Sequence, residues 1–236
     1  MSGGAPPPSV LVPIPHDRQA DRRWKVVVDG RETTQLTELT LSHPSYGTLT
    51  YGMAPRGYDT WAWREHGGGG VVVVPFVVVD GALHVGVVEQ ERHTQGGRVW
   101  NVPRGFRDEG ESSEAAAARE LREETRFTRG TPLPLGGAPA NPNSAFFETP
   151  ESGMGVAFFG VEVAREHIER RDGAWVFREA ALDDDRRAQD EEHIAAFRFA
   201  PWTEVAALAD MFSLSACARL LRRLEADGRI AVTTPG

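Results

Sequence analysis

The 236-residue sequence is poor in cysteine, in lysine and in long apolar runs. Its single cysteine, Cys217, excludes a disulfide framework and any zinc or iron–sulfur site built from several cysteines, and it fits a reducing compartment. Lys25 is the only lysine, and no glycine-rich stretch precedes it, which excludes a phosphate-binding loop of the G-x-x-x-x-G-K type. The longest apolar run, residues 71–79, is far too short to span a bilayer.

Charge and composition narrow the class of protein further. The 34 acidic residues outnumber the 26 basic ones, and the net charge of −8 argues against a general nucleic-acid coat. Hydrophobic residues make up 40% of the chain and charged residues 25%, as in ordinary globular proteins. The first 15 residues lack the charged start and long apolar stretch of a secretory signal. We therefore expect a cytoplasmic protein with no nucleic-acid or membrane partner.

Proline and glycine divide the chain into three parts. The proline-rich residues 1–20 predict a disordered tail. Residues 21–70 alternate in the manner of strands and predict a β-rich region, which ends in four glycines at 67–70 that favour a flexible joint. Residues 71–236 are expected to form the main domain.

Local patterns predict the elements of these parts. Strand-like alternation in the β-rich region falls on residues 25–28, 48–51 and 58–63. In the main domain, strands are predicted at 71–79, 83–88, 99–102, 154–163, 174–177 and 195–200. Helices are predicted at 113–126, 203–209 and 215–226. The sequence thus favours an α/β or α+β unit after residue 70.

The first of these helices concentrates carboxylates. Because a helix turns about 100° per residue, Glu120, Glu123 and Glu124 share one face within about 100°. Arg119 lies four residues before Glu123 and is close enough to pair with it. Three carboxylates on a small patch repel one another unless a cation lies among them, and Mg²⁺ or Mn²⁺ suits such an oxygen-rich site. A solvated helix decorated with salt bridges is the alternative.

The adjoining face of this helix is expected to pack on the rest of the domain. Ala117, Ala118 and Leu121 lie beside the carboxylates and are expected to pack on the sheet.

The wider spacing around these carboxylates resembles the Nudix box, G-x5-E-x7-R-E-U-x-E-E-x-G-U, in which U is apolar. Eight of the nine specified positions match between Gly105 and Phe127. The exception is Arg126, where the pattern has the glycine that ends the helix in a left-handed conformation. Arg126 is therefore expected to lengthen the helix slightly or to shift the following loop. The resemblance implies an α+β fold, an α/β/α sandwich of the Nudix type with a mixed sheet between helices.

The resemblance also implies a reaction. Nudix enzymes hydrolyse a nucleoside diphosphate linked to another moiety, with water as nucleophile and Mg²⁺ or Mn²⁺ as cofactor. Carried onto this sequence, Glu120 and Glu124 are metal ligands, Glu123 shares their cluster, and the backbone carbonyl of Arg104 completes the metal site. Glu123 and Glu124 are also the expected catalytic residues. Supporting residues, which position the loop and the helix, are Gly105, Glu111 and Arg119.

Flanking sequence is similar to the ADP-ribose and nucleotide-sugar pyrophosphatase group. The similarity rests on the strand pair before the box and on Pro142 beyond it. In that group a late loop supplies an extra acidic residue as base or metal ligand. The matching residue here is Glu192, with Glu191 as the alternative and Glu148 and Glu151 as further candidates.

The same group has an N-terminal strand region that exchanges across a homodimer and helps to bind adenine. Residues 21–70 correspond to it in position and strand character, so the resemblance implies a homodimer. Tyr58 and Trp61 are candidates for stacking on the base, although aromatics on alternate strand positions also serve as core. Arg92 is a candidate phosphate contact, with an ordinary surface arginine as the alternative.

Two other functions remain open at this point. A nucleoside triphosphate pyrophosphohydrolase would share the box but need a different base pocket. A non-catalytic Nudix-like domain would sense such a ligand without cleaving it. The presence of Glu120, Glu123 and Glu124 favours an enzyme, and the large N-terminal strand region favours a nucleoside diphosphate derivative, ADP-ribose or a nucleotide sugar, as substrate.

Overall fold

Contacts within the chain divide it into two compact units. The first comprises residues 1–68 and 141–154, and the second comprises residues 69–140 and 155–236. The computed structural model describes residues 25–28, 30–35, 39–43, 47–53, 59–65, 69–92, 97–140, 155–187, 189, 193–208 and 210–230.

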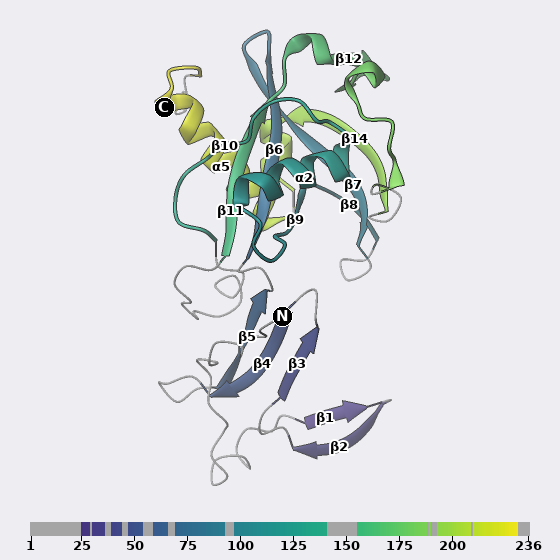
Figure 1. Ribbon diagram of the computed structural model, residues 1–236, viewed down its shortest axis with the longest axis vertical. Coiled ribbons are helices and arrows are strands. Elements are labelled where there is room, and N and C mark those ends of the chain that lie inside the picture. Colours follow the sequence, from purple (N-terminus) through teal and green to yellow (C-terminus); the bar gives the residue numbers. More distant parts are fainter. Residues whose placement is uncertain are drawn as a thin grey trace. The chain divides into compact units, whose positions relative to one another are not determined.

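The first unit is built from antiparallel strands (Figure 1). Its pairs are β1 (Lys25–Val28) with β2 (Arg31–Gln35), and β3 (Leu39–His43) with β4 (Gly47–Met53) and β5 (Asp59–Glu65). Gly30, at φ 72°, lies in the tight turn between the first two strands. Tyr51 of β4 is buried, and its ring lies edge-on to Trp61 of β5 at a centroid distance of 5.8 Å. Strands β2 and β3 were not predicted as separate strands.

The second unit is a nine-stranded mixed sheet with helices on both faces (Figure 1). Its strands are β6 (Gly69–Val79), β7 (Ala82–Arg92), β8 (Gly97–Asn101), β9 (Arg104–Phe106), β10 (Leu133–Pro134), β11 (Gly155–Glu162), β12 (Ile168–Arg171), β13 (Ala174–Phe177) and β14 (Ile194–Pro201). Its helices are α2 (Ser113–Thr125), α4 (Trp202–Ala206) and α5 (Met211–Ala226), with 3₁₀ turns η5 (Arg165–His167) and η6 (Glu179–Ala181). Strands β6 and β11 run parallel, and the other pairs are antiparallel.

The two faces of β6 explain the continuous apolar run in the sequence. Val72 and Val74 belong to the core under α5, whereas Val71 and Val73 belong to the core under α2. A strand covered on both faces is apolar at every position rather than at alternate ones. The arrangement confirms the predicted α+β fold with a mixed sheet between helices.

Strands β6 and β7 pair at one end and diverge at the other, where the start of the box joins the sheet. Strand β6 pairs with β7 at one end and with β9 at the other, while the far end of β7 pairs with β8. Strand β9 therefore reaches the sheet at the start of the box. A Cβ atom at Gly70 would lie 2.6 Å from the Gly105 carbonyl oxygen, so glycine at Gly70 permits this close approach.

Element boundaries differ from the predictions mainly at short strands and helix starts. The short strands β9, β10 and β12 were not predicted. Helix α5 begins at Met211 rather than at residue 215, because Asp210 caps it by accepting a hydrogen bond from the Ser213 amide. No helix in the described part of the chain is long and apolar enough to cross a membrane.

Candidate active site

The carboxylates of the box lie on helix α2, which the local sequence specifies from end to end. The Ser112 side chain caps its N-terminus by accepting a hydrogen bond from the Ala115 amide, and an alanine-rich turn follows. Ala116 and Ala117 are fully buried against the sheet. Ala118, which was expected to pack there, is exposed, because the buried stripe is turned toward Ala116 instead.

Arg126 ends this helix in a left-handed conformation. Its φ of 63° and ψ of 4° are those of the glycine it replaces, and its amide donates to the Arg122 carbonyl at 2.7 Å. The helix stops at Thr125, so the expected lengthening does not occur.

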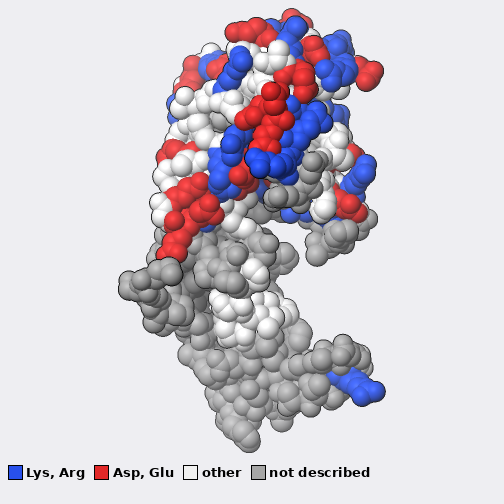
Figure 2. All heavy atoms as spheres, turned by 45° about the vertical axis from the view of Figure 1, so that its right-hand side comes forward, with Lys and Arg blue, Asp and Glu red and all other residues white. Residues whose placement is uncertain are grey.

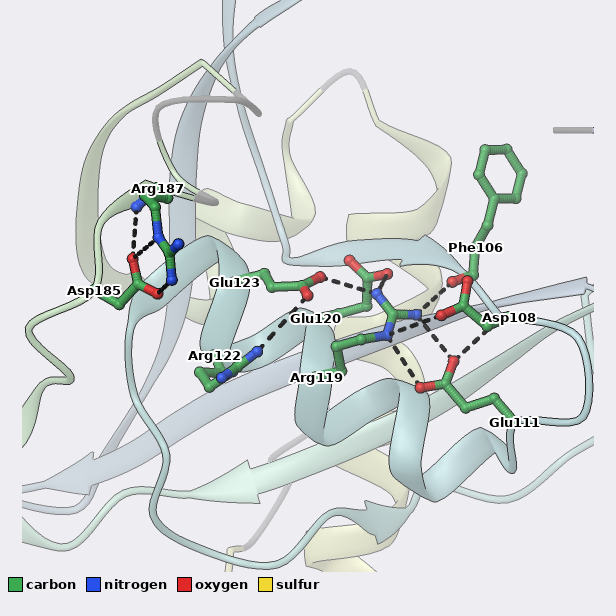
Figure 3. A network of polar contacts seen from close by, with 9 residues as sticks. All are labelled: Phe106, Asp108, Glu111, Arg119, Glu120, Arg122, Glu123, Asp185 and Arg187. Atoms are coloured by element: carbon green, nitrogen blue, oxygen red, sulfur yellow. Dashed lines mark hydrogen bonds and ion pairs between the residues drawn. The ribbon is translucent and has the colours of Figure 1, made fainter. Parts of the chain in front are cut away.

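Arg119 is the hub of a polar network around the box (Figure 3). Its guanidinium makes a two-pronged contact with Glu111, in which Nε donates to Oε1 at 3.0 Å and Nη2 donates to Oε2 at 3.0 Å. Nη1 contacts Glu120 Oε1 at 2.7 Å and Glu123 Oε2 at 2.9 Å. Nη2 also donates to the Phe106 carbonyl at 2.7 Å. The predicted pairing of Arg119 with Glu123 is confirmed.

These contacts shift the ionisation of both partners. The hydrogen bond from Arg119 holds the pKa of Glu111 below its ordinary value. The same bond, with the nearby charge of Glu120, raises the pKa of Arg119. Glu111 also accepts a hydrogen bond from the Asp108 amide at 3.0 Å. Glu111 in its charged form thereby ties the loop before α2 to the helix.

The three glutamates differ in exposure. Glu120 and Glu124 are 7% and 1% exposed, whereas Glu123 is half-buried. A Cβ atom at Gly105 would lie 2.2 Å from the Glu120 carboxylate, so that carboxylate packs directly on the strand backbone beside Arg104. Two acidic side chains are therefore held inside the domain, and that of Glu120 lies where β9 meets α2.

Comparison with known proteins identifies this arrangement. The family model of the NUDIX domain matches residues 70–217. The chain belongs to the NUDIX family. No curated protein matches the sequence. The membership confirms the predicted family, its fold and its enzyme class, the Nudix hydrolases.

The chain is similar to several solved structures, among them these two. A crystal structure of an ADP compounds hydrolase is 17% identical, with a TM-score of 0.51, over 84% of this chain and 96% of that one. The NUDIX domain of Shewanella oneidensis NrtR complexed with ADP ribose is 19% identical, with a TM-score of 0.43, over 66% of this chain and 87% of that one.

Nudix proteins generally use divalent metal ions, and the donors of this Nudix site suit such an ion. Glu120, Glu123 and Glu124 offer only oxygen atoms, the ligands that Mg²⁺ and Mn²⁺ prefer. The absence of a side chain at Gly105 leaves room for the Glu120 carboxylate. In this structure Glu120 and Glu123 both reach toward Arg119, and among the residues described no three acidic, histidine or cysteine side chains converge closely enough to hold a metal. The donor chemistry fits, provided that these carboxylates turn away from Arg119.

Other predicted site residues fall in different places. Arg92 is half-buried at the end of β7, in the second unit. Trp61 belongs to the first unit, where it packs on Tyr51. Tyr58, Pro142, Glu148, Glu151, Glu191 and Glu192 lie outside the described residues.

Three polar residues around the site were missed from the sequence. Asp210 pairs with the Arg104 side chain at 2.6 Å, and Gln189 donates to the Glu124 carbonyl at 2.8 Å. Glu179 accepts a hydrogen bond from Arg126 at 2.9 Å. A capping pattern at 210–213 could have indicated Asp210. Nothing in the local sequence indicates the other two contacts.

Proposed function

We propose that this chain hydrolyses the diphosphate linkage of a nucleoside diphosphate derivative, ADP-ribose or a nucleotide sugar, with Mg²⁺ or Mn²⁺ as cofactor. The observation that carries the proposal is the cluster of Glu120, Glu123 and Glu124 on α2, with the Glu120 carboxylate against the Gly105 backbone. The structure of similar fold that is described as an ADP compounds hydrolase supports this substrate class.

The chain's own residues would act mainly by holding and orienting. Glu120, Glu123, Glu124 and the Arg104 carbonyl would hold the cation, which would supply positive charge against the diphosphate and make water a better nucleophile. Glu111 and Arg119 fix the loop and helix that carry these ligands.

Further residues would act on the proton and on the substrate. Glu123, Glu124 or Glu192 would take the proton of the attacking water. Arg92 would contact a phosphate, and Tyr58 and Trp61 would stack on the base.

The oligomeric state, the location and the other partners of the protein are inferred from its net charge and its N-terminal region. We infer a homodimer formed through residues 21–70, in the cytoplasm, with no nucleic-acid or membrane partner. The net charge of −8 supports the absence of nucleic acid. On the face of the second unit shown in Figure 2, acidic side chains lie beside basic ones rather than leaving a field of one sign. Light scattering of the full chain, beside a variant without residues 1–68, which leaves β6 whole, would test the dimer.

The test of function is a hydrolysis panel with Mg²⁺ and with Mn²⁺. The panel contains ADP-ribose, nucleotide sugars, dinucleotides and nucleoside triphosphates. Glu124→Gln should lower turnover about a thousandfold, since a metal ligand carries several kcal/mol of charge stabilisation. Glu114→Gln, at an exposed glutamate in the first turn of the same helix, is the matched control and should keep wild-type turnover.

Each other result of the panel has a definite meaning. Preferred cleavage of triphosphates would replace the proposed substrate class. Saturable ligand binding without turnover, unchanged in Glu124→Gln, would leave a sensor on a Nudix scaffold.

A further inference from the structure

Arg126 combines a strained backbone with a buried charge. As an arginine in the left-handed region it costs about 1 kcal/mol relative to glycine. Its side chain is only 4% exposed, although arginine is rarely buried without a partner. The helix end itself needs only the backbone amide of this residue, which bonds to Arg122. The side chain therefore serves something other than the cap.

The side chain binds the segment that follows β13. Nε donates to the Asp183 carbonyl at 2.5 Å, and Nη2 donates to Glu179 Oε1 at 2.9 Å. The Asp183 amide in turn donates to the Arg126 carbonyl at 2.8 Å. The backbone and the side chain of Arg126 thus both bind the segment formed by residues 179–183.

A second contact joins Gln189, farther along the chain, to the last turn of helix α2. Gln189 donates from Nε2 to the Glu124 carbonyl at 2.8 Å. The last carbonyls of a helix have no partner within it, so a side-chain donor here fixes the final turn. That turn carries Glu124, the most buried carboxylate of the box. A cavity of about 290 Å³ lies beside these contacts, and Thr125, Arg126, Glu179 and Gln189 are among its lining residues.

We propose that Arg126 is a positioning residue: it moors residues 179–183 to the C-terminal end of α2, so that Gln189 holds the last turn of the helix and with it Glu124. The proposal rests on the proposed function, because Glu124 matters as a ligand and catalytic residue of that reaction. It assigns a use to the residue at which this box departs from the family pattern. Glycine at this position would keep the cap and lose the mooring.

The test compares Arg126→Gly and Arg126→Lys with the wild-type full chain. Arg126→Gly removes the mooring and relaxes the backbone, so the fold should be retained. Arg126→Lys keeps the charge but loses the planar fork that reaches both Asp183 and Glu179. Arg222→Gln, at an exposed position of α5, controls for the change in net charge.

Three readouts separate a positioning role from a merely structural one. Hydrogen exchange of residues 179–189 should rise about tenfold in Arg126→Gly, since those amides lose their tether. The Kd for Mn²⁺, measured by titration without substrate, should rise about tenfold, in line with a displaced ligand. In Arg126→Gly the value of kcat should fall about tenfold, while KM stays within about twofold of the wild-type value. The kcat of Arg126→Lys should lie between those of the wild-type chain and Arg126→Gly.

A further variant, Gln189→Leu, removes only the contact between Gln189 and the Glu124 carbonyl. It should lower kcat and Mn²⁺ affinity while hydrogen exchange at Asp183 stays at the wild-type rate. The same effect on all three readouts in Arg222→Gln would overturn the assignment.

Failure of the mooring and failure of the proposed function give different results. If no diphosphate is cleaved by the wild-type chain, the function fails, and hydrogen exchange and Mn²⁺ affinity still test the mooring. Unchanged exchange in Arg126→Gly would overturn the proposal. So would raised exchange with kcat, KM and Mn²⁺ affinity all at wild-type values. A wild-type chain that neither binds Mn²⁺ nor turns over substrate would overturn both.

Discussion

Nη1 of Arg104 lies 2.6 Å from Oδ1 of Asp210, which ties the strand that begins the box to the N-terminus of the last helix. The other carboxylate oxygen of Asp210 accepts hydrogen bonds from the amide and hydroxyl of Ser213. The Ser213 hydroxyl accepts from the Val102 amide at 3.1 Å, which closes the network on the same strand region. Burial alone would raise the pKa of Asp210, but the charge of Arg104 and these hydrogen bonds together hold it below its ordinary value.

Asp210→Ala should destabilise the protein by about 2 kcal/mol. It removes a helix cap, worth about 1 kcal/mol, and leaves the partly buried Arg104 without its charge partner. The free energy of unfolding in urea measures the change. Asp227→Ala is the matched control, because Asp227 pairs with Arg223 at the other, exposed end of the same helix. Its loss should cost less than about 1 kcal/mol, and an equal effect of the two variants would contradict the prediction.

Gly105→Ala should separate metal binding from stability. The new Cβ would lie 2.2 Å from the Glu120 carboxylate, which ends a flexible side chain and can move aside. The free energy of unfolding should change by less than about 1 kcal/mol, while Mn²⁺ affinity falls about tenfold or more. Gly70→Ala is the contrasting variant, since its Cβ would meet the Gly105 carbonyl oxygen at 2.6 Å and backbone cannot yield cheaply. Wild-type Mn²⁺ affinity in Gly105→Ala would show that Glu120 is no ligand.

The box helix could be predicted from the sequence because its determinants are local. Helical spacing places Arg119 beside Glu123, and the cap and the apolar stripe lie within the same few turns. The rotation of the helix was slightly wrong, as the burial of Ala116 instead of Ala118 shows. An alanine-rich face gives little contrast between neighbouring positions, so the sheet decides which alanine is covered.

Contacts between distant parts of the chain could not be predicted in the same way. Strand β9 has three residues, too few for a periodic pattern, and it exists because Gly70 lets Gly105 approach β6. Arg104 and Asp210 are 106 residues apart, and Arg126 and Asp183 are 57 apart. Each of the two arginines looks like an ordinary surface charge until the fold brings its partner to it.

The Arg126–Glu179 pair should weaken in acid. The hydrogen bond from Arg126 lowers the pKa of Glu179 in the folded protein, so the contribution of the pair is present above the ordinary glutamate pKa of about 4.3. It is lost as the pH falls from there through the lowered folded pKa. Exchange protection of the Asp183 amide, corrected for intrinsic exchange, should therefore drop below about pH 4.

Glu179→Gln gives the control for this acid effect. The variant should show the lower protection at every pH, and the two proteins should converge in acid. A wild-type protein whose Asp183 protection does not depend on pH would contradict the prediction.

The rate at which Cys217 is alkylated should measure how often helix α5 detaches from the sheet. The thiol is 1% exposed, and burial raises its pKa to about 11, so at pH 8 it is both protonated and out of reach of an alkylating reagent. Labelling followed by mass spectrometry should then proceed only through unfolding or undocking of the helix. Asp210→Ala, at about 2 kcal/mol, should raise the labelling rate about thirtyfold, whereas Asp227→Ala, at less than about 1 kcal/mol, should raise it less than about fivefold. Rapid labelling of the native wild-type chain would mean that α5 is not docked as the structure places it, and the Asp210 prediction would fall with it.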